Sequence, residues 1–483
     1  MRQWRQTMRA VALSLVLLVG VGAGCTRGSM PREVVARLQP VQLVWWGVNE
    51  TSEDVQPLIE AYKQLHPHVT ITYRKLRLEE YETALLDALS EGDFKGPDIL
   101  TVPATWTRRY QSKLLPAPKT VTMPFVRLTG TVRKEQVGEL RTTATPDPRG
   151  LRDMFLDVVV ADAVLSDGTR DAVYGLPLYV DTLVLYANRD LLNAGGIPEP
   201  AKTWAELQQQ VPRLTRRDAS GAIVQAGAAL GTTANIPRAF DVLSLLMMQN
   251  GTQMTAGGAP SFHQLPTGLT GRASLPAMDA LTFYADFANP GKLVSTWDEA
   301  QPDALDAFTR GKLAYFFGYS YHRQIIAARA PQLNLVVAQA PHIAAAVDPQ
   351  TGLVIGSDVV PGGQGAPITY ADFWLQTVSE RTRYPNETWD FVTYATTQPQ
   401  VVQRFLDRAK RPTALRRLVA VQQEDPAMRV FAHQLLTAQT WYHGKNAAGA
   451  EQAFAQLMRD AREGTIDLRR ALQLAAQKVQ QTL

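Results

Sequence analysis

Cysteine is almost absent from this chain of 483 residues, since Cys25 is the only one. A single cysteine excludes an intramolecular disulfide framework and the zinc sites built from several thiolates. The seven histidines show no metal-ligand spacing, and the sequence has no glycine-rich phosphate loop. We therefore expect neither a metal ion nor a cofactor.

A large net charge is also missing. The chain has 49 basic and 45 acidic residues, and the first 24 residues contain three arginines and no acid. Removing these 24 residues lowers the formal net charge from +4 to +1. No basic stretch interleaved with aromatic residues stands out, so we expect no nucleic acid partner.

The only long hydrophobic run lies at the N-terminus. Three arginines, an apolar segment at 10–21 and small residues at 22–24 precede Cys25. This order is typical of a secretory signal peptide, here residues 1–24, and the run is too short for a spanning helix. Cys25 resembles the lipid-modified first residue of a bacterial lipoprotein. We expect residues 25–39 to be a lipidated tether that anchors the protein outside the cytoplasmic membrane, at the cell surface or in the periplasm. An ordinary signal peptide that leaves Cys25 unmodified is the alternative.

The order of elements predicts an α/β fold. A strand at 41–47, a helix at 54–65 and a strand at 69–73 form a strand–helix–strand unit, which implies a parallel pair. A chain of 483 residues is too long to fold around a single hydrophobic core, so we expect at least two lobes. From Asn386 onward the chain is predicted to be helical.

One polar pair interrupts the most strand-like run of the chain. The segment 180–186 is β-branched and aromatic, and it contains Asp181 and Thr182. A carboxylate buried there needs a partner. Asp181 either bonds the backbone of a neighbouring strand or faces a ligand where the strand crosses between two lobes.

Several motifs lie around this run. They are Tyr-Gly-Leu-Pro at 174–177, Leu-Tyr-Ala-Asn-Arg-Asp-Leu-Leu at 185–192, Lys-Thr-Trp-Ala-Glu-Leu at 202–207 and Gly-Tyr-Ser at 318–320. Together they resemble the family 1 extracellular solute-binding proteins, the sugar-binding subunits of bacterial ABC importers, to which the maltodextrin-binding protein is distantly related. The resemblance runs from about residue 40 to the end and is weakest at 117–150 and 251–275.

The resemblance implies a two-lobed periplasmic-binding-protein fold of type II, with a sheet flanked by helices in each lobe and a ligand cleft between them. It implies a monomeric receptor, not an enzyme, that delivers its solute to an ABC permease and closes by a hinge near 180–182 and Gly318. The expected parts are lobe 1 at 40–180 with an insertion at about 117–150, lobe 2 at 181–317, a return to lobe 1 at 318–378, and a helical part of lobe 2 at 379–483.

Carbohydrate sites combine flat aromatic faces with polar groups that bond hydroxyls. The aromatic candidates are Trp46, which we expect to be the exposed member of the adjacent pair Trp45 and Trp46, Trp106 in a polar loop, and Trp441, which matches a stacking aromatic of the family. Asp181 matches the family's acidic residue at the first crossing between lobes. Further candidates, taken from loop or helix-start positions, are Tyr319, Ser320, Asn49, Glu50, Thr105, Asn235 and Arg411. Packing or a structural salt bridge is the alternative for each.

Two other functions stay open. A receptor for a polyamine or a peptide would share the fold, and a secreted glycoside hydrolase needs two carboxylates whose separation is invisible in sequence. The motif at 318–322 lacks the second glycine of a nucleophile elbow. Tyr319 and Tyr321 have no accompanying cluster of histidines and carboxylates, which argues against an iron site.

Overall fold

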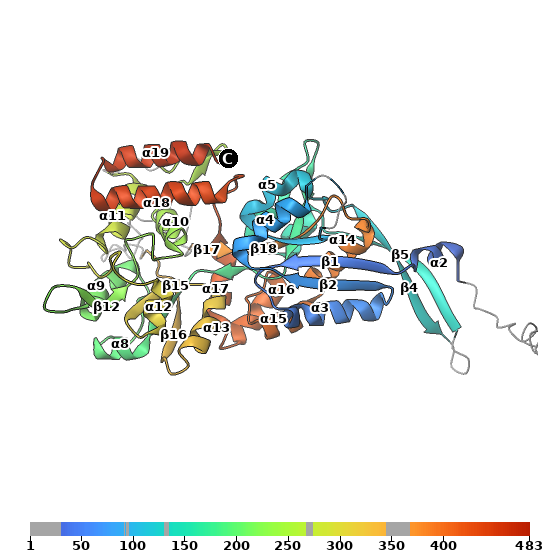
Figure 1. Ribbon diagram of the computed structural model, residues 1–483, viewed down its shortest axis with the longest axis horizontal. Helices are drawn as coiled ribbons and strands as arrows, with labels where there is room; N and C mark the ends of the chain where they lie inside the picture. The colour runs from blue at the N-terminus through green and yellow to red at the C-terminus, as the bar shows by residue number, and fades with distance from the viewer. Residues whose placement is uncertain (1–29, 91, 93–95, 130–134, 267–273, 344–367) are drawn as a thin grey trace, which may run out of the picture.

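The computed structural model describes residues 30–483 except 91, 93–95, 130–134, 267–273 and 344–367. The predicted signal peptide and Cys25 therefore lie outside the described residues. Two lobes occupy opposite ends of the long axis of the molecule (Figure 1). Over the described ranges, every helix is too short or too polar to cross a bilayer.

Lobe 1 is built on a five-stranded sheet in the order β2-β1-β3-β18-β8. β1 runs parallel to β2 and β3, which confirms the predicted parallel pair, and β18 is antiparallel to β3 and β8. The helix predicted at 54–65 is α3, which begins at Ser52 because the Thr51 side chain accepts from the Asp54 N–H and Asp54 accepts from the Thr51 N–H. The bounds are β1 (Val41–Gly47), β2 (Val69–Lys75), β3 (Ile99–Pro103), β8 (Gly175–Pro177), β18 (Trp374–Val378), α3 (Ser52–Leu65) and α4 (Leu78–Ala88).

Lobe 2 is built on a second five-stranded sheet in the order β11-β12-β15-β10-β16. Helix α10 (Ala239–Gln249) is buried on nearly every side, which its almost wholly apolar sequence allows. The last two helices, α18 (Ala447–Glu463) and α19 (Leu468–Gln480), pack into the same core. The strands are β10 (Val184–Asn188), β11 (Arg216–Arg217), β12 (Ile223–Ala228), β15 (Leu313–Gly318) and β16 (Leu335–Gln339).

A small sheet joins the segments that connect the lobes. It contains β9 (Asp181–Thr182), β17 (Thr369–Asp372) and β19 (Ala438–Gln439) in the order β19-β17-β9. β17 is antiparallel to β9, where Asp372 is opposite Asp181, and parallel to β19. The predicted continuous strand at 180–186 is thus divided: β9 belongs to this connecting sheet and β10 to lobe 2.

The lobe boundaries differ from the expected ones in the second half of the chain. After Gly318 the chain stays in lobe 2, because β16 pairs with β10 and Ile326 of α13 (Ser320–Arg329) packs in the lobe 2 core. The helices α14 (Pro385–Thr397), α15 (Pro399–Ala409) and α16 (Arg416–Glu424) pack in the core of lobe 1 instead of lobe 2. An amphipathic sequence shows that a helix has a buried face, but it does not show which core that face joins.

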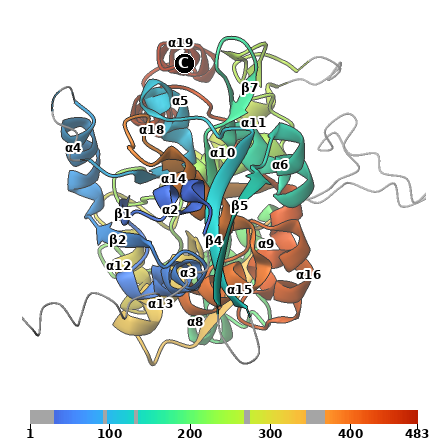
Figure 2. The ribbon, with the colours of Figure 1, turned by 90° about the vertical axis from the view of Figure 1, so that its right-hand side faces the viewer.

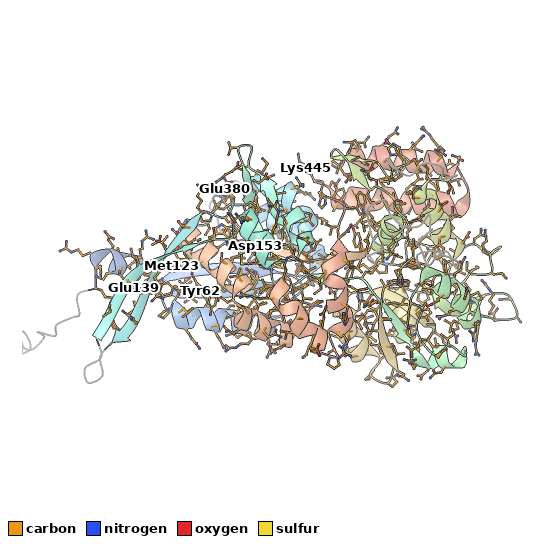
Figure 3. The ribbon with its side chains drawn as sticks, turned by 180° about the vertical axis from the view of Figure 1, so that it is seen from behind. Tyr62, Met123, Glu139, Asp153, Glu380 and Lys445 are labelled. Carbon is orange, nitrogen blue, oxygen red and sulfur yellow. The ribbon has the colours of Figure 1, made fainter. Side chains whose placement is uncertain are left out.

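The segment at 117–150, expected to be an insertion, contains a hairpin. Strands β4 (Thr120–Thr129) and β5 (Glu135–Ala144) pair antiparallel and project from the end of lobe 1 that points away from lobe 2 (Figures 1 and 2). Helix α2 (Arg32–Arg37), within the expected tether, packs on both strands. Figure 3 shows Glu139 on the projecting part of the hairpin and Met123 nearer to lobe 1.

The other elements cover the two sheets or connect them. Helices α6 and α7 are separated by Phe155 and Leu156, whose backbone is extended. These remaining elements are α5 (Thr107–Tyr110), α6 (Pro148–Met154), α7 (Asp157–Ala163), β6 (Val164–Ser166), β7 (Asp171–Val173), α8 (Arg189–Ala194), α9 (Trp204–Leu214), β13 (Thr255–Ala256), β14 (Ala259–Pro260), α11 (Pro276–Asp286), α12 (Ala304–Thr309) and α17 (Arg429–Gln434).

Candidate functional site

Asp181 lies at the junction of the lobes and bonds the start of α13. Its Oδ2 atom accepts from the Ser320 N–H at 2.9 Å and from the Ser320 hydroxyl at 2.6 Å, while Oδ1 accepts from the Thr182 N–H at 2.9 Å. The side chain is only 2% exposed, and burial raises its pKa to about 6, although Arg411 and the Ser320 hydroxyl act in the opposite direction. A buried carboxylate requires a hydrogen-bond partner, and the partner of Asp181 is the N-terminus of helix α13 in lobe 2.

Arg411 approaches the same place from lobe 1. It follows Lys410, whose left-handed backbone conformation (φ 53°) ends α15. The guanidinium lies over the ring of Tyr179 at 5.2 Å and over the ring of Tyr321 at 5.7 Å, and its Nη1 is 3.5 Å from the Ser320 hydroxyl. Arg411 is 7% exposed, so this cation is held between tyrosine rings of the two lobes.

The loop after β1 supplies Asn49 and Glu50. The Asn49 amide donates to the Tyr179 hydroxyl at 3.3 Å. Glu50 is 3% exposed, and burial raises its pKa, while the charge of Arg411 and the hydroxyl of Tyr179 lower it. This loop follows the carboxyl end of a parallel strand, where ligands of α/β sheets bind.

Arg238 completes the group from lobe 2, and the sequence analysis missed it. Its Nη2 donates to the Tyr321 hydroxyl at 2.7 Å and to Asp372 at 3.1 Å, and its guanidinium lies 4.6 Å from the centre of the Tyr319 ring. The Tyr319 hydroxyl donates to Asp241 at 2.8 Å, and burial raises the pKa of Asp241 to about 7. The Arg-x-x-Asp spacing at the start of the helix after loop 231–237 is the signal that would have pointed to Arg238.

We call these residues the junction cluster. It comprises four carboxylates, two guanidinium groups and three tyrosines: Glu50, Asp181, Asp241, Asp372, Arg238, Arg411, Tyr179, Tyr319 and Tyr321. The carboxylates accept hydrogen bonds and the guanidinium groups donate them, and both lie beside aromatic rings. This combination of groups binds hydroxyl-rich molecules. In the part of the chain that the structure describes, His, Cys, Asp and Glu form no group of three that could hold a metal ion.

Three of the predicted site residues contact other parts of lobe 1. The expectation that Trp46 is exposed is wrong, because both faces of β1 are covered: Trp45 packs in one core and Trp46, which is 8% exposed, lies under the Arg74 guanidinium in another. Trp106 is half-buried with its ring 5.9 Å from Tyr110, and Thr105 precedes it in the same short turn. Their described contacts do not reach the junction cluster.

Two more residues predicted to bind the ligand, Trp441 and Asn235, bond groups inside lobe 2 instead. Trp441 is 4% exposed, donates to the Ser244 hydroxyl at 2.9 Å and stacks on Phe240 with ring centres 5.7 Å apart. The Asn235 side chain accepts from Trp297 and donates to two backbone carbonyls, so its amide is fully engaged.

A cavity of about 300 Å³ adjoins the junction cluster on lobe 2. Arg238 and His322 line it together with Phe316, Phe317 and Asp306. Binding sites for small molecules begin at about this volume. A second cavity of about 730 Å³ lies at the base of the β4–β5 hairpin, lined by Lys119 and Arg170 among others, on a different part of the molecule.

The fold and the position of the cluster define a two-lobed binding protein whose candidate site lies where the lobes meet. The model of the family described as bacterial extracellular solute-binding protein matches residues 48–402, which is more than half of the chain. The chain therefore belongs to this family, as the sequence motifs predicted.

Solved structures with the same fold include three proteins described as binding a sugar or as bound with one. The cyclic α-maltosyl-1,6-maltose binding protein of Arthrobacter globiformis has a TM-score of 0.67 at 16% identity, covering 92% of this chain and 99% of that protein. An ABC transporter solute-binding protein of Thermotoga lettingae bound with α-D-tagatose has a TM-score of 0.64 at 15% identity, with 92% and 99% coverage. The sugar-binding protein MalE of Xanthomonas citri has a TM-score of 0.61 at 18% identity, with 92% and 97% coverage. These likenesses confirm the predicted two-lobed fold.

Proposed function

We propose that this solute-binding protein is a carbohydrate receptor of an ABC importer, and that its sugar binds at the junction cluster. The observation that carries the proposal is the set of buried and half-buried carboxylates and guanidinium groups contributed by both lobes to one place. Sugar hydroxyls donate and accept at once, so they pair with both kinds of group. The three similar proteins named above, each described as binding a sugar or as bound with one, favour the same ligand class.

A thermal-shift screen of the chain from Thr26 onward, against mono- and oligosaccharides, tests the proposal. A sugar at about a hundred times its Kd is expected to add about 2.7 kcal/mol to the free energy of unfolding. The same samples, followed by chromatography over hours, measure breakdown. A shift without breakdown supports a receptor, and breakdown of the sugar would point to a hydrolase instead. No shift with any sugar, followed by a shift with a polyamine or peptide, would replace the sugar by that solute.

We infer further that the receptor acts as a monomer outside the cytoplasmic membrane, attached by a lipid on Cys25, and passes its sugar to a permease. The sequence before and around Cys25 supports the anchor. The test is fractionation of cells that express the full chain or Cys25→Ser. The full chain is expected in the membrane fraction with the mass of a lipid added at Cys25, and the variant in the soluble extracytoplasmic fraction. Equal release of both proteins would refute the anchor.

A further inference from the structure

Helix α2 lies along the β4–β5 hairpin with its first residues on the projecting part. A Cβ atom added at Gly138, the fourth residue of β5, would lie 2.7 Å from Val34 Cγ1 and 2.9 Å from Met30 Sδ. At the other end of the helix, Arg37 donates to the carbonyl of Thr122, the third residue of β4, on the side of lobe 1. Met30, where the described chain begins, therefore contacts the part of the hairpin that points away from both lobes (Figure 1).

The tether before Met30 is short. Five residue steps separate Met30 from Cys25, where we propose the lipid. An extended chain spans at most about 3.6 Å per residue, so Met30 lies within about 18 Å of the lipid-bearing residue. From Gly138 to the start of β5 at Glu135, the strand advances a further distance of about 10 Å. An anchor of this length brings the projecting part of the hairpin, rather than lobe 2, to the headgroups of the membrane.

Unpaired arginines and exposed valines lie on this part of the molecule. Arg32 and Arg127 are exposed, and neither side chain has a hydrogen bond or an ion pair within the described ranges. Val35 is 48% exposed and Val137 is 40% exposed. One exposed acid, Glu33, follows Arg32 in the chain. We call the two arginines and the two valines the hairpin surface, and cations combined with apolar side chains suit the headgroup region of a bilayer.

The net charge of the chain is distributed in the same sense. Residues 25–37 and 120–144 together contain seven basic and three acidic residues, a net charge of +4. The chain after residue 24 has a net charge of +1, so all its other residues together carry −3. A bilayer with anionic lipids therefore attracts the tether, α2 and the hairpin, and it repels the rest of the molecule.

We propose that the hairpin surface binds the anionic headgroups of the membrane that holds the lipid, and that this contact fixes lobe 1 against the bilayer. The inference rests on the anchor at Cys25 proposed above and adds a second membrane contact, made by side chains of the folded protein. Lobe 2 lies at the opposite end of the long axis (Figure 1), so it stays free to move about the connecting sheet.

Sedimentation with lipid vesicles measures this contact in the absence of a lipid anchor. The chain from Thr26 keeps every described residue and lacks Cys25. It is expected to partition at least tenfold more strongly into phosphatidylcholine vesicles with about 30% phosphatidylglycerol than into phosphatidylcholine alone, and to lose this preference at about 0.5 M salt. Equal partition into both vesicles, or into neither, would overturn the inference. Tighter binding to soluble polyglutamate than to the anionic vesicles would also overturn it, in favour of an acidic protein partner.

Charge variants test which residues make the contact. Arg32→Ser and Arg127→Ser are each expected to weaken partition into the anionic vesicles about fivefold, and Glu33→Lys should strengthen it. Arg310→Ser is the matched control, because it removes an exposed arginine that follows α12 in lobe 2, and it should bind as wild type. Urea denaturation verifies that each variant is folded. Equal losses in all three arginine variants, or wild-type binding in all of them, would overturn the inference.

A single introduced cysteine tests the orientation on the vesicle. Val137→Cys and Val224→Cys allow a fluorophore to be attached at valines of similar exposure, 40% in the hairpin and 47% in β12 of lobe 2. On anionic vesicles with nitroxide-labelled headgroups, the fluorophore at position 137 should be quenched and the one at position 224 should not. Equal quenching at both positions would overturn the inference. These results depend neither on Cys25 nor on a sugar, so the fractionation and thermal-shift tests decide the anchor and the receptor separately.

Discussion

At the scale of single residues, burial decides what each predicted site residue does. Asp181, Glu50 and Arg411 come together at the lobe junction, where the low dielectric strengthens each contact. Trp441 and Asn235 have the residue types of a sugar site, but their polar atoms bond groups inside lobe 2. Residue type names the chemistry that a side chain can perform, and its surroundings decide whether a solute can reach it.

Trp441→Ala is expected to destabilise lobe 2 by about 3–5 kcal/mol, because it removes a buried ring packed against Phe240 and Phe454. Urea denaturation measures the loss. Trp106→Ala is the comparison, since its half-buried ring should cost less. Unchanged stability of Trp441→Ala with a loss of sugar affinity would instead support the stacking role that the family resemblance implies.

Asp241→Asn is expected to change how stability depends on pH. Burial raises the pKa of this carboxyl from 3.8 to about 7, so the folded state holds its proton more tightly than the unfolded state. Its contribution to stability is therefore full below about pH 4 and is lost as the pH rises through 7. The asparagine variant lacks this loss, so its stability relative to wild type should rise between pH 4 and 7, by on the order of 4 kcal/mol. Urea denaturation at several pH values measures the difference.

Asp218→Asn is the matched comparison for that experiment. The Ser220 hydroxyl and nearby backbone N–H groups lower the pKa of Asp218, which is exposed in a turn. Ionisation of Asp218 therefore favours folding, and replacing it should lower stability at neutral pH relative to acid pH. A flat difference between Asp241→Asn and wild type over the same pH range would contradict the assignment of Asp241.

At the scale of elements, the β4–β5 hairpin lies in a segment where the sequence resembles the family least, and α2 packs on it. Val34 of α2 is buried against the hairpin, and Arg37 donates to the Thr122 carbonyl at 3.0 Å. The helix comes close to β5 because that strand has glycine at 138: a Cβ atom there would lie 2.7 Å from Val34 Cγ1 and 2.9 Å from Met30 Sδ. Within the expected tether, Met30 and Val34 thus pack against the hairpin of lobe 1.

Gly138→Val is expected to release α2 from the hairpin, because the new side chain would occupy the position of Val34. Limited proteolysis with trypsin should then cut faster at Arg32 and Arg37, while the unfolding midpoint changes little. Thr142→Val, at an exposed position of the same strand, is the control and should keep the wild-type cleavage rate. Protection of both arginines in Gly138→Val would show that α2 holds its place without this contact.

At the scale of the whole molecule, each lobe has its own hydrophobic core, and a three-stranded sheet joins them. Such a connection allows the lobes to rotate as rigid bodies about a few residues. The start of α13 contacts both the connecting strand and lobe 1, since the Ser320 hydroxyl bonds Asp181 and lies beside Arg411. These contacts favour the arrangement in which the lobes lie together.

Ser320→Ala is expected to shift the sugar-free protein toward separated lobes, because it removes the hydroxyl that links α13 to Asp181. Small-angle X-ray scattering should show a larger radius of gyration for the variant, and the sugar affinity should fall by about tenfold. Ser274→Ala removes a hydroxyl that bonds Asp279 within lobe 2, and it should behave as wild type. An unchanged radius of gyration and affinity in Ser320→Ala would contradict this role of α13.

Local signals in the sequence mark the ends of several helices. Thr51 with Asp54 marks the start of α3, and Gly464, at a φ of 63°, ends α18. The proline at 399 begins α15. Each signal depends on a few neighbouring residues, so it can be seen without the fold. The family and its two-lobed architecture also followed from short motifs.

The candidate site was only partly predictable, because its contacts join residues that lie far apart in the sequence. Arg238 bonds Asp372, which lies 134 residues later in the chain, and Asp181 bonds Ser320, 139 residues later. Nothing in the neighbourhood of either residue specifies such a partner. The assignment of α14 to lobe 1 likewise depends on the strands that it meets, not on its own amphipathic pattern.

The sequence by itself determined the α/β class, the family and the ends of several helices, because capping and turn signals act within a few residues. Only the tertiary structure decided which core each late helix joins, that Trp46 and Trp441 are buried, and that Glu50 and Arg411 come together at the lobe junction. These outcomes depend on burial and pairing between distant segments, and both arise only when the chain is folded.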